Sequence, residues 1–242
     1  MKLLATLFAL LTPLSLQAQI VPEKTQQAIV SHSSSWASSH AEMYLYERES
    51  GGAWKQVDGP IKARLGRKGS AWGIGLQKNP TGATMKKEGD GKSPAGVFEI
   101  GGAWGDATNI KKHPKLPYRK VTPRDLWVED SKSKHYNQHL ILDHAPKTTW
   151  EKKQQMKQND HAHSLKLFIK HNAAPNATPQ GGSAVFFHIW RGGGSKPTAG
   201  CTTMPENELK KVVAWVDPTK HPVYILLPKS EYKAKQSAWK LP

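Results

Sequence analysis

Short apolar runs alternate with polar residues along most of the chain, and glycine or proline separates one run from the next. MYLYE (43–47) precedes Ser50-Gly51-Gly52, AWKQV (53–57) precedes Asp58-Gly59-Pro60, and AGVFEI (95–100) precedes Gly101-Gly102. Apolar residues that recur with a period of two between turn residues are typical of antiparallel strands. The pattern therefore predicts a mainly β domain with tight turns.

Two further runs are apolar enough to predict central strands, HLILD (139–143) and AVFFHIW (184–190), and PVYILLP (222–228) predicts the last strand. The polar segment 145–181 between the first two is expected to be a loop or a partly helical lid. Residues 19–40 are rich in Ser and Gln with little periodicity, so we interpret them as an N-terminal lead-in.

The clearest helix is predicted over residues 205–216, PENELKKVVAWV. Thr203 and Glu206 fit the S/T-x-x-E capping pattern, so the Thr203 side chain is expected to cap this helix. One helix face is apolar and is formed by Leu209, Val212, Val213 and Val216. The chain thus predicts a single β-rich domain with few helices over residues 41–228, followed by a C-terminal tail, 229–242.

The first 18 residues have the layout of a secretory signal peptide. Lys2 gives one positive charge, an apolar run follows, and Ala18 is a small residue at the expected cleavage point. The run is interrupted by polar residues and is shorter than the roughly 20 apolar residues of a membrane-spanning helix. We therefore expect export to the periplasm or cell wall, with no transmembrane segment after signal removal.

The charge of the chain is strongly positive. Lys and Arg number 35 against 19 Asp and Glu, which gives +16, and removal of Lys2 with the signal leaves +15. For an exported protein, anionic envelope polymers are the expected partners of such a charge. Nucleic acid is not expected, because neither a recognition helix nor a stacking motif is visible.

Cys201 is the single cysteine, so it cannot form an intramolecular disulfide. The predicted helix behind it is expected to lower the pKa of the thiol. Gly200 leaves room for a substrate carbonyl, and the amides of Cys201 and Thr202 are expected to face its developing oxyanion. His188 lies thirteen residues upstream, and the glycines of the intervening loop allow its imidazole to meet the thiol as a base.

Three segments together resemble a known family. HIWRGGGSKPTAGC (188–201) resembles the active-site segment of L,D-transpeptidases of the YkuD type, in which a histidine on a strand precedes a loop and an S/T-x-G-C motif. KKEGDGKSPAGVFEI (86–100) is similar to the family's Gly-rich turn before a T/S-P-x-G-x-F strand. WVEDSKSKHYNQHLILDHA (127–145) is similar to the segment between these motifs in an exported branch. The resemblance covers about residues 40–228 and implies the fold of that catalytic domain, with a capped helix after the nucleophile.

The resemblance implies that Cys201 is the acyl-accepting nucleophile and His188 its base, with Thr198 and Gly200 as the hydroxyl residue and glycine of the motif. It further implies attack on a peptidoglycan stem peptide between an L-configured centre and a terminal D-alanine. The acyl group then passes to an amine, giving a cross-link, or to water, giving carboxypeptidase activity. Attachment or release of wall proteins by the same thioester chemistry is also implied. No cofactor or metal is expected.

This sequence departs from the family pattern at three positions. Ile189 follows the histidine where a glycine is usual, Ala199 stands where a histidine often precedes Gly-Cys, and Thr203 replaces the usual arginine.

Four further residues are candidates for substrate contacts. Arg191 could supply a cation for a substrate carboxylate and Trp190 a platform for an apolar stem. Asp143 and His144 follow a predicted central strand and are also candidate cleft residues.

Two alternative functions remain open at the sequence level. His161 and His163, together with His144, His171 or Asp143, could supply three ligands to the zinc ion of a peptidase. The positive charge and the missing arginine at Thr203 instead suit a catalytically inactive protein that binds the cell wall.

Overall fold

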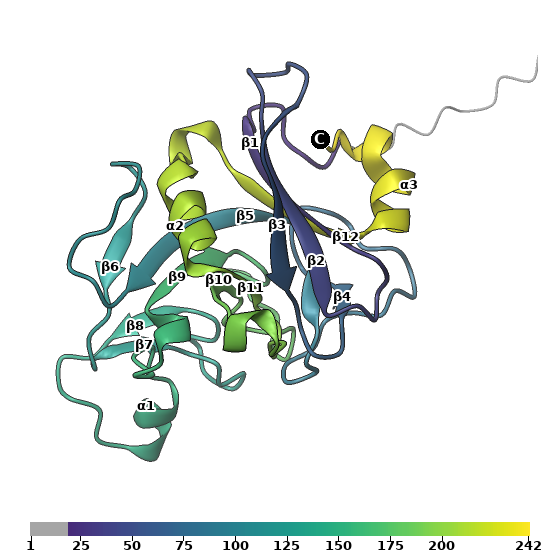
Figure 1. The fold of residues 1–242 in the computed structure, drawn as a ribbon. Coiled ribbons are helices and arrows are strands. Elements are labelled where there is room, and N and C mark those ends of the chain that lie inside the picture. Colours follow the sequence, from purple (N-terminus) through teal and green to yellow (C-terminus); the bar gives the residue numbers. More distant parts are fainter. Residues whose placement is uncertain (1–18) are drawn as a thin grey trace, which may run out of the picture.

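The structure is a computed structural model and describes residues 19–242, so the predicted signal peptide lies outside the described residues. Figure 1 shows a strongly curved sheet with helices packed on it. Within residues 19–242, no helix combines the length and the apolar character that a membrane crossing requires.

Strands dominate the fold, as the sequence predicted. In chain order they are β1 (Gln27–Ser33), β2 (His40–Glu47), β3 (Lys55–Arg64), β4 (Ser70–Trp72), β5 (Ser93–Gly105), β6 (Tyr118–Lys120), β7 (Asp125–Trp127), β8 (His139–Ile141), β9 (Leu165–Ile169), β10 (Phe186–Ile189), β11 (Thr202–Met204) and β12 (Val223–Pro228). The helices are α1 (Thr149–Lys153), α2 (Glu206–Trp215) and α3 (Lys229–Trp239), with short 3-10 turns η1 (His161–His163), η2 (Gly192–Gly194) and η3 (Pro218–Lys220).

The main sheet closes on itself. Its strand order is β12-β1-β2-β3-β11-β10-β9-β5-β4, and β12 also pairs with β5, so the strands from β12 to β5 form a closed ring. β10 lies between β9, its antiparallel neighbour, and β11, its parallel neighbour. This arrangement joins segments that are distant in sequence.

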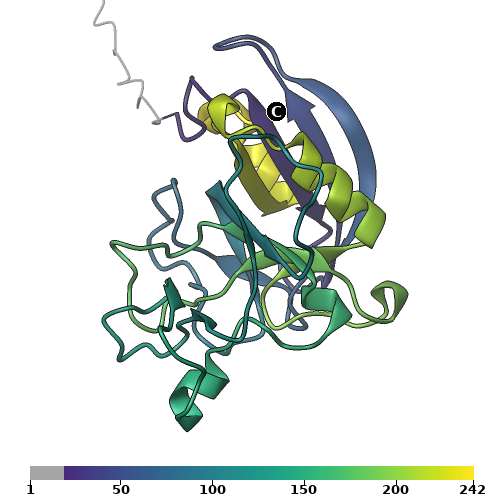
Figure 2. The same cartoon turned by 90° about the vertical axis from the view of Figure 1, so that its left-hand side faces the viewer.

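Side-chain alternation along the strands gives the main sheet an apolar inner face. Ile61 of β3, Phe187 of β10 and Met204 of β11 belong to the largest buried cluster, and Leu209 and Val213 of α2 join it. Figures 1 and 2 show α2 lying against the strands in both views. Burial of such side chains contributes about 1.5 to 3 kcal/mol each.

The two ends of the described chain pack together on a second apolar cluster. Val30 of β1 and Ile225 of β12 contact this cluster, which Tyr232 and Trp239 of α3 cover. β1 lies within the stretch interpreted as a lead-in, and α3 within the stretch interpreted as a tail. Both are therefore integral parts of the packed domain.

One predicted central strand was wrong. HLILD forms only the three-residue strand β8, which pairs with β7 in a separate two-stranded sheet, and Ile141 is 52% exposed. The place in the main sheet belongs to β9, inside the segment expected to be a loop or lid. Lys166 interrupts the apolar run of β9 and made it look polar, although this lysine is only 3% exposed.

The predicted helix is present, but its cap was wrong. Thr203 lies in β11, where it pairs with Arg64 of β3, and α2 begins after Pro205 without a side-chain cap. Pairing of β11 with its neighbours holds Thr203 in an extended strand, so its side chain cannot turn back onto the helix amides. The S/T-x-x-E box instead occurs at α1, between Thr148 and Glu151.

Candidate active site

The parallel pairing of β10 and β11 brings Cys201 beside the start of β10. Phe187 lies opposite Thr202, so Cys201 lies next to Phe186. The Phe186 amide donates a hydrogen bond to Cys201 Sγ (3.5 Å), and Sγ donates to the Ala184 carbonyl (3.4 Å). Because alternate residues of a strand share one face, the His188 side chain lies on the same face as Phe186.

The residues before the cysteine form a tightly bonded turn. Thr198 Oγ1 donates to the Cys201 carbonyl (2.6 Å) and accepts from the Gly200 amide (3.0 Å). A Cβ on Gly200 would lie 3.0 Å from the Lys92 carbonyl and 3.5 Å from Lys86 Cε. Thr198 and Gly200 therefore shape the turn, and the Gly200 amide is already used within it.

Cys201 opens onto a cleft of about 290 Å³. Its wall contains apolar residues and charged residues of both signs. Among the lining residues are Lys86, Glu88, Glu129, His163, Lys166 and Phe186. The sulfur therefore faces a space in which a zwitterionic peptide could find partners for both of its charges.

The environment of Cys201 disfavours the thiolate in the free protein. Cys201 packs against the aromatic cluster that contains Trp127 and Phe186. Burial raises the pKa of its thiol to about 11, against the opposing effects of the Phe186 amide and of Lys166. The expected lowering of the thiol pKa by a helix was wrong, because β11 separates Cys201 from α2.

His188 is held as a neutral imidazole with one nitrogen available. The residue is 3% exposed, and its Nδ1 donates to the Ile189 carbonyl (2.9 Å), which leaves the lone pair on Nε2. Burial, and then the neighbouring His163, lower the pKa of His188 to about 3. The two imidazole rings stack with centroids 4.5 Å apart.

The histidines proposed for the zinc alternative lie in different surroundings. His163 lines the Cys201 cleft, and its Nδ1 contacts Asp160 (3.3 Å) and Arg191 (3.3 Å). His161 is exposed and contacts Glu206 (3.0 Å), whereas His171 is fully buried between backbone groups of Ile74 and Gly181. Within residues 19–242, no three His, Cys, Asp or Glu side chains lie close enough to hold a metal ion.

The four candidates for substrate contacts lie elsewhere. Arg191 is exposed and pairs with Asp160. Trp190 lines a different cleft, while Asp143 and His144 bond to each other beside the N-terminus of α1. None of these four described residues lines the Cys201 cleft. The Thr202 side chain points into the core, where its hydroxyl contacts the Tyr224 hydroxyl (3.0 Å). The expected oxyanion contact concerns its backbone amide and stays a prediction.

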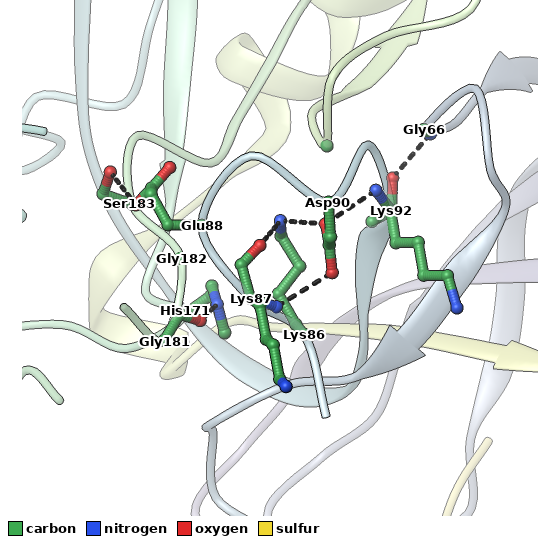
Figure 3. A network of polar contacts seen from close by, with 12 residues as sticks. Gly66, Lys86, Lys87, Glu88, Asp90, Lys92, His171, Gly181, Gly182 and Ser183 are labelled. Carbon is green, nitrogen blue, oxygen red and sulfur yellow. Dashed lines mark hydrogen bonds and ion pairs between the residues drawn. The ribbon is translucent and has the colours of Figure 1, made fainter. Parts of the chain in front are cut away.

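Two buried lysines line the cleft instead. Lys166 lies opposite His188 in the register of β9 and β10, and its Nζ donates to the Met156 carbonyl (2.8 Å). Burial lowers the pKa of Lys166 to about 8. Lys86 is held by Asp90 (2.6 Å) and the Lys87 carbonyl (2.7 Å), as Figure 3 shows. A lysine inside an apolar run, as in LKLFI, is the sequence signal that could have identified Lys166.

Two carboxylates, Glu88 and Glu129, line the same cleft. Glu88 Oε2 accepts from Tyr136 Oη (2.5 Å) and from Ser183 Oγ (2.7 Å), and Figure 3 shows the contact with Ser183. Loss of solvent around the Glu129 carboxyl, and then the nearby Glu88, raise the pKa of Glu129 to about 6. Such a shift is common where charged groups gather in a cleft.

Comparison with known families agrees with the sequence resemblance. The model of the L,D-transpeptidase catalytic domain, YkuD, matches residues 37–225, which is well over half of the chain. A search of curated proteins finds no match. The mainly β fold is the one that this family implies. The chain therefore belongs to the YkuD family of L,D-transpeptidase catalytic domains.

Proposed function

We propose that this protein is an L,D-transpeptidase that acts on peptidoglycan stem peptides through a thioester at Cys201. The observation that carries this proposal is Cys201 at a charged cleft, directly before β11, whose parallel pairing with β10 sets Thr203 opposite His188. Members of the family are cysteine-dependent L,D-transpeptidases, and peptidoglycan is the substrate that the family implies.

In the proposed reaction, Cys201 and His188 act as a neutral pair. His188 Nε2 takes the thiol proton as sulfur attacks the substrate carbonyl, so the S–C bond forms while the thiol ionises. The imidazolium then protonates the leaving amine as the C–N bond breaks. An amine or water then attacks the thioester and the C–S bond breaks, while His188 takes a proton from the attacking group and passes it to the departing sulfur. Because the pKa of the thiol is about 11 and that of His188 about 3, the proton moves only during attack.

The charged wall of the cleft supports a peptide substrate with both an amine and a carboxylate. Lys86 and Lys166 can offset the substrate carboxylate or the oxyanion of the tetrahedral intermediate. Glu88 and Glu129 can accept from the substrate ammonium group. In this proposal the two lysines and two glutamates make the substrate contacts. The sequence had assigned these contacts to Arg191, Trp190, Asp143 and His144.

We also propose that the mature protein works in the periplasm or cell wall. The sequence of residues 1–18 and the net charge of +15 support this location. Attraction to anionic envelope polymers would hold the enzyme near its substrate.

The test is an assay on purified disaccharide peptides with tetrapeptide stems, analysed by liquid chromatography and mass spectrometry. Wild type is expected to release D-alanine and to give either a cross-linked dimer or a tripeptide stem. Cys201→Ala should give neither product, and a chelator should leave the wild-type rate unchanged. Full turnover by Cys201→Ala would end the thioester proposal, and loss of turnover on chelation would favour the zinc alternative.

A catalytically inactive wall-binding protein is the second candidate. The charge of +15 and Thr203 at the usual arginine position favour it. Sedimentation with isolated cell-wall sacculi, combined with the peptide assay, separates the two functions. Binding to sacculi without any product from wild type would select the second candidate.

A further inference from the structure

A second cleft lies apart from Cys201, between strands β2 and β3 and the loop that follows β10. Its volume is about 470 Å³, and it shares no lining residue with the Cys201 cleft among residues 19–242. Its wall includes His32, Glu42, Lys62, Arg64, Trp190 and Lys229. Nothing in the proposed reaction uses this space.

Arg64 is the unusual residue of this second cleft. Only 6% of it is exposed, and its Nε atom is buried without a hydrogen-bond partner among the described residues. In the described part of the chain, the arginines that form ion pairs are Arg119 and Arg191. A guanidinium that has a nitrogen buried without a partner, and no counter-charge, costs free energy, which a bound anion would recover.

Two neighbours of Arg64 also hold polar atoms without partners. Thr203 lies opposite Arg64 in the register of β11 and β3, and its Oγ1 is buried and unbonded among residues 19–242. His32 lines the same cleft, and its Nδ1 is likewise buried and unbonded there. Native proteins leave few such groups unsatisfied. The three unpartnered polar atoms of Arg64, Thr203 and His32 indicate that this region can bind a polar group.

The charge of the second cleft fits an anion. Lys62, Arg64 and Lys229 line it, and Glu42 is its one acidic lining residue among residues 19–242. Glu42 already pairs with Lys229 (3.2 Å), so Lys62 and Arg64 retain their charge for a ligand. A cation would be repelled from this wall.

The loop after β10 leaves the second cleft open toward a ligand. Gly193 has φ 60°, and a Cβ built there would meet nothing within 4 Å. A Cβ on Gly194 would lie 2.7 Å from the Trp190 ring, so glycine is needed for the ring to pack there. The packed Trp190 ring therefore forms one side of the cleft, and the space beside Gly193 is open.

We infer that the second cleft binds an oxyanion, the carboxylate or phosphate group of a ligand, through the Arg64 guanidinium. The planar fork of arginine matches the two oxygens of such a group, and these charge-assisted hydrogen bonds are strong. Of the two other unpartnered groups, His32 lines this cleft and can add a further hydrogen bond to the ligand. The reaction proposed at Cys201 uses none of the residues that line this second cleft.

The test is a nuclear magnetic resonance titration of ¹⁵N-labelled protein with acetate and, separately, inorganic phosphate, at constant ionic strength. Saturable shifts are expected at the amides of His32, Arg64 and Gly193, with one probe saturating at the lower concentration and so identifying the preferred group. The absence of saturable shifts at this cleft with both probes would overturn the inference. This arm needs no variant and so does not depend on the folding of a mutant.

Variants of Arg64 test the residue itself. Arg64→Met is expected to weaken binding of the preferred probe by at least about tenfold, since a hydrogen bond to a charged group is lost. Arg64→Lys keeps the charge without the fork and should retain part of the affinity. Arg124→Met is the matched control, because Arg124 is exposed and lies outside the second cleft. Unchanged affinity in a folded Arg64 variant would contradict the assignment.

Discussion

The two faces of the same few strands differ sharply in chemistry. On the inner face, Phe187 and Met204 are fully buried in the main apolar cluster. On the outer face, strand register aligns a polar row, which consists of Lys166 on β9, His188 on β10, Thr203 on β11 and Arg64 on β3. Each member of the polar row is at most 6% exposed, so the row costs stability that the inner face must supply. Buried polar residues held at such a cost are typical of functional sites, so the polar row is the face to which the proposed reaction is assigned.

Replacing His188 on the polar face is expected to reduce the reaction rate most. His188→Ala is expected to lower kcat/KM in the stem-peptide assay by about 10² to 10⁴, because a positioned base is removed. The control is His161→Ala, since His161 is exposed and contacts only Glu206 among the described side chains. A rate within about twofold of wild type in a folded His188→Ala protein would assign His188 to structure alone.

Replacing its neighbour Phe187 on the apolar face is expected to reduce stability instead. Phe187→Ala should lower the free energy of unfolding by about 3 to 5 kcal/mol, because it opens a cavity in the inner cluster. Urea denaturation measures the loss, and turnover per folded molecule should be largely retained. Phe187→Leu is the control and should cost less than Phe187→Ala. Equal effects of the His188 and Phe187 variants on both stability and rate would remove the distinction between the faces.

The pH dependence of thiol alkylation sharpens the comparison. Since burial raises the pKa of Cys201 to about 11, the thiolate fraction grows about tenfold per pH unit below that value. The rate of labelling by iodoacetamide should therefore rise about 10³-fold from about pH 7 to pH 10 without a plateau. A plateau beginning near neutral pH would show a stabilised thiolate, as the sequence had predicted.

Lys166 gives the smallest expected effect. Lys166→Met keeps the buried stem but removes a positive charge that opposes the raised pKa of Cys201, so the thiol should ionise less readily. Alkylation at a fixed pH is expected to slow by about tenfold, equivalent to about one pKa unit. Lys170→Met is the matched control, because Lys170 is exposed at the end of the same segment and pairs with Glu99 (3.1 Å). The same rates in all three proteins would exclude an electrostatic role for Lys166.

The sequence predicted the local features of the fold well. The β-rich class, the strands at AVFFHIW and PVYILLP and the helix after Cys201 all follow from local periodicity, and the structure contains them. β9 was missed because Lys166 breaks its apolar pattern, and burial of that lysine depends on the cleft. Thr203 was assigned to a cap because the capping pattern is local, whereas β-sheet pairing is not.

The candidate site was less predictable than the fold. Local motifs identified Cys201 and His188; His188 lies on β10, and Cys201 directly precedes the neighbouring strand β11. Their catalytic roles stay predictions. The charged wall comes from residues near positions 86, 129 and 166, which only the register of distant strands brings together. A single sequence holds no signal for that register. Residues close to His188 in sequence, such as Arg191, were therefore predicted to contact the substrate.

Trapping the acyl-enzyme tests the central claim most directly. The protein is mixed with a tetrapeptide-stem donor, quenched in acid and measured by intact-protein mass spectrometry, followed by peptide mapping. The account predicts an added mass equal to the donor acyl group, located on Cys201 and absent from Cys201→Ala. Product formation by Cys201→Ala, or an acyl group mapped to another residue, would contradict it.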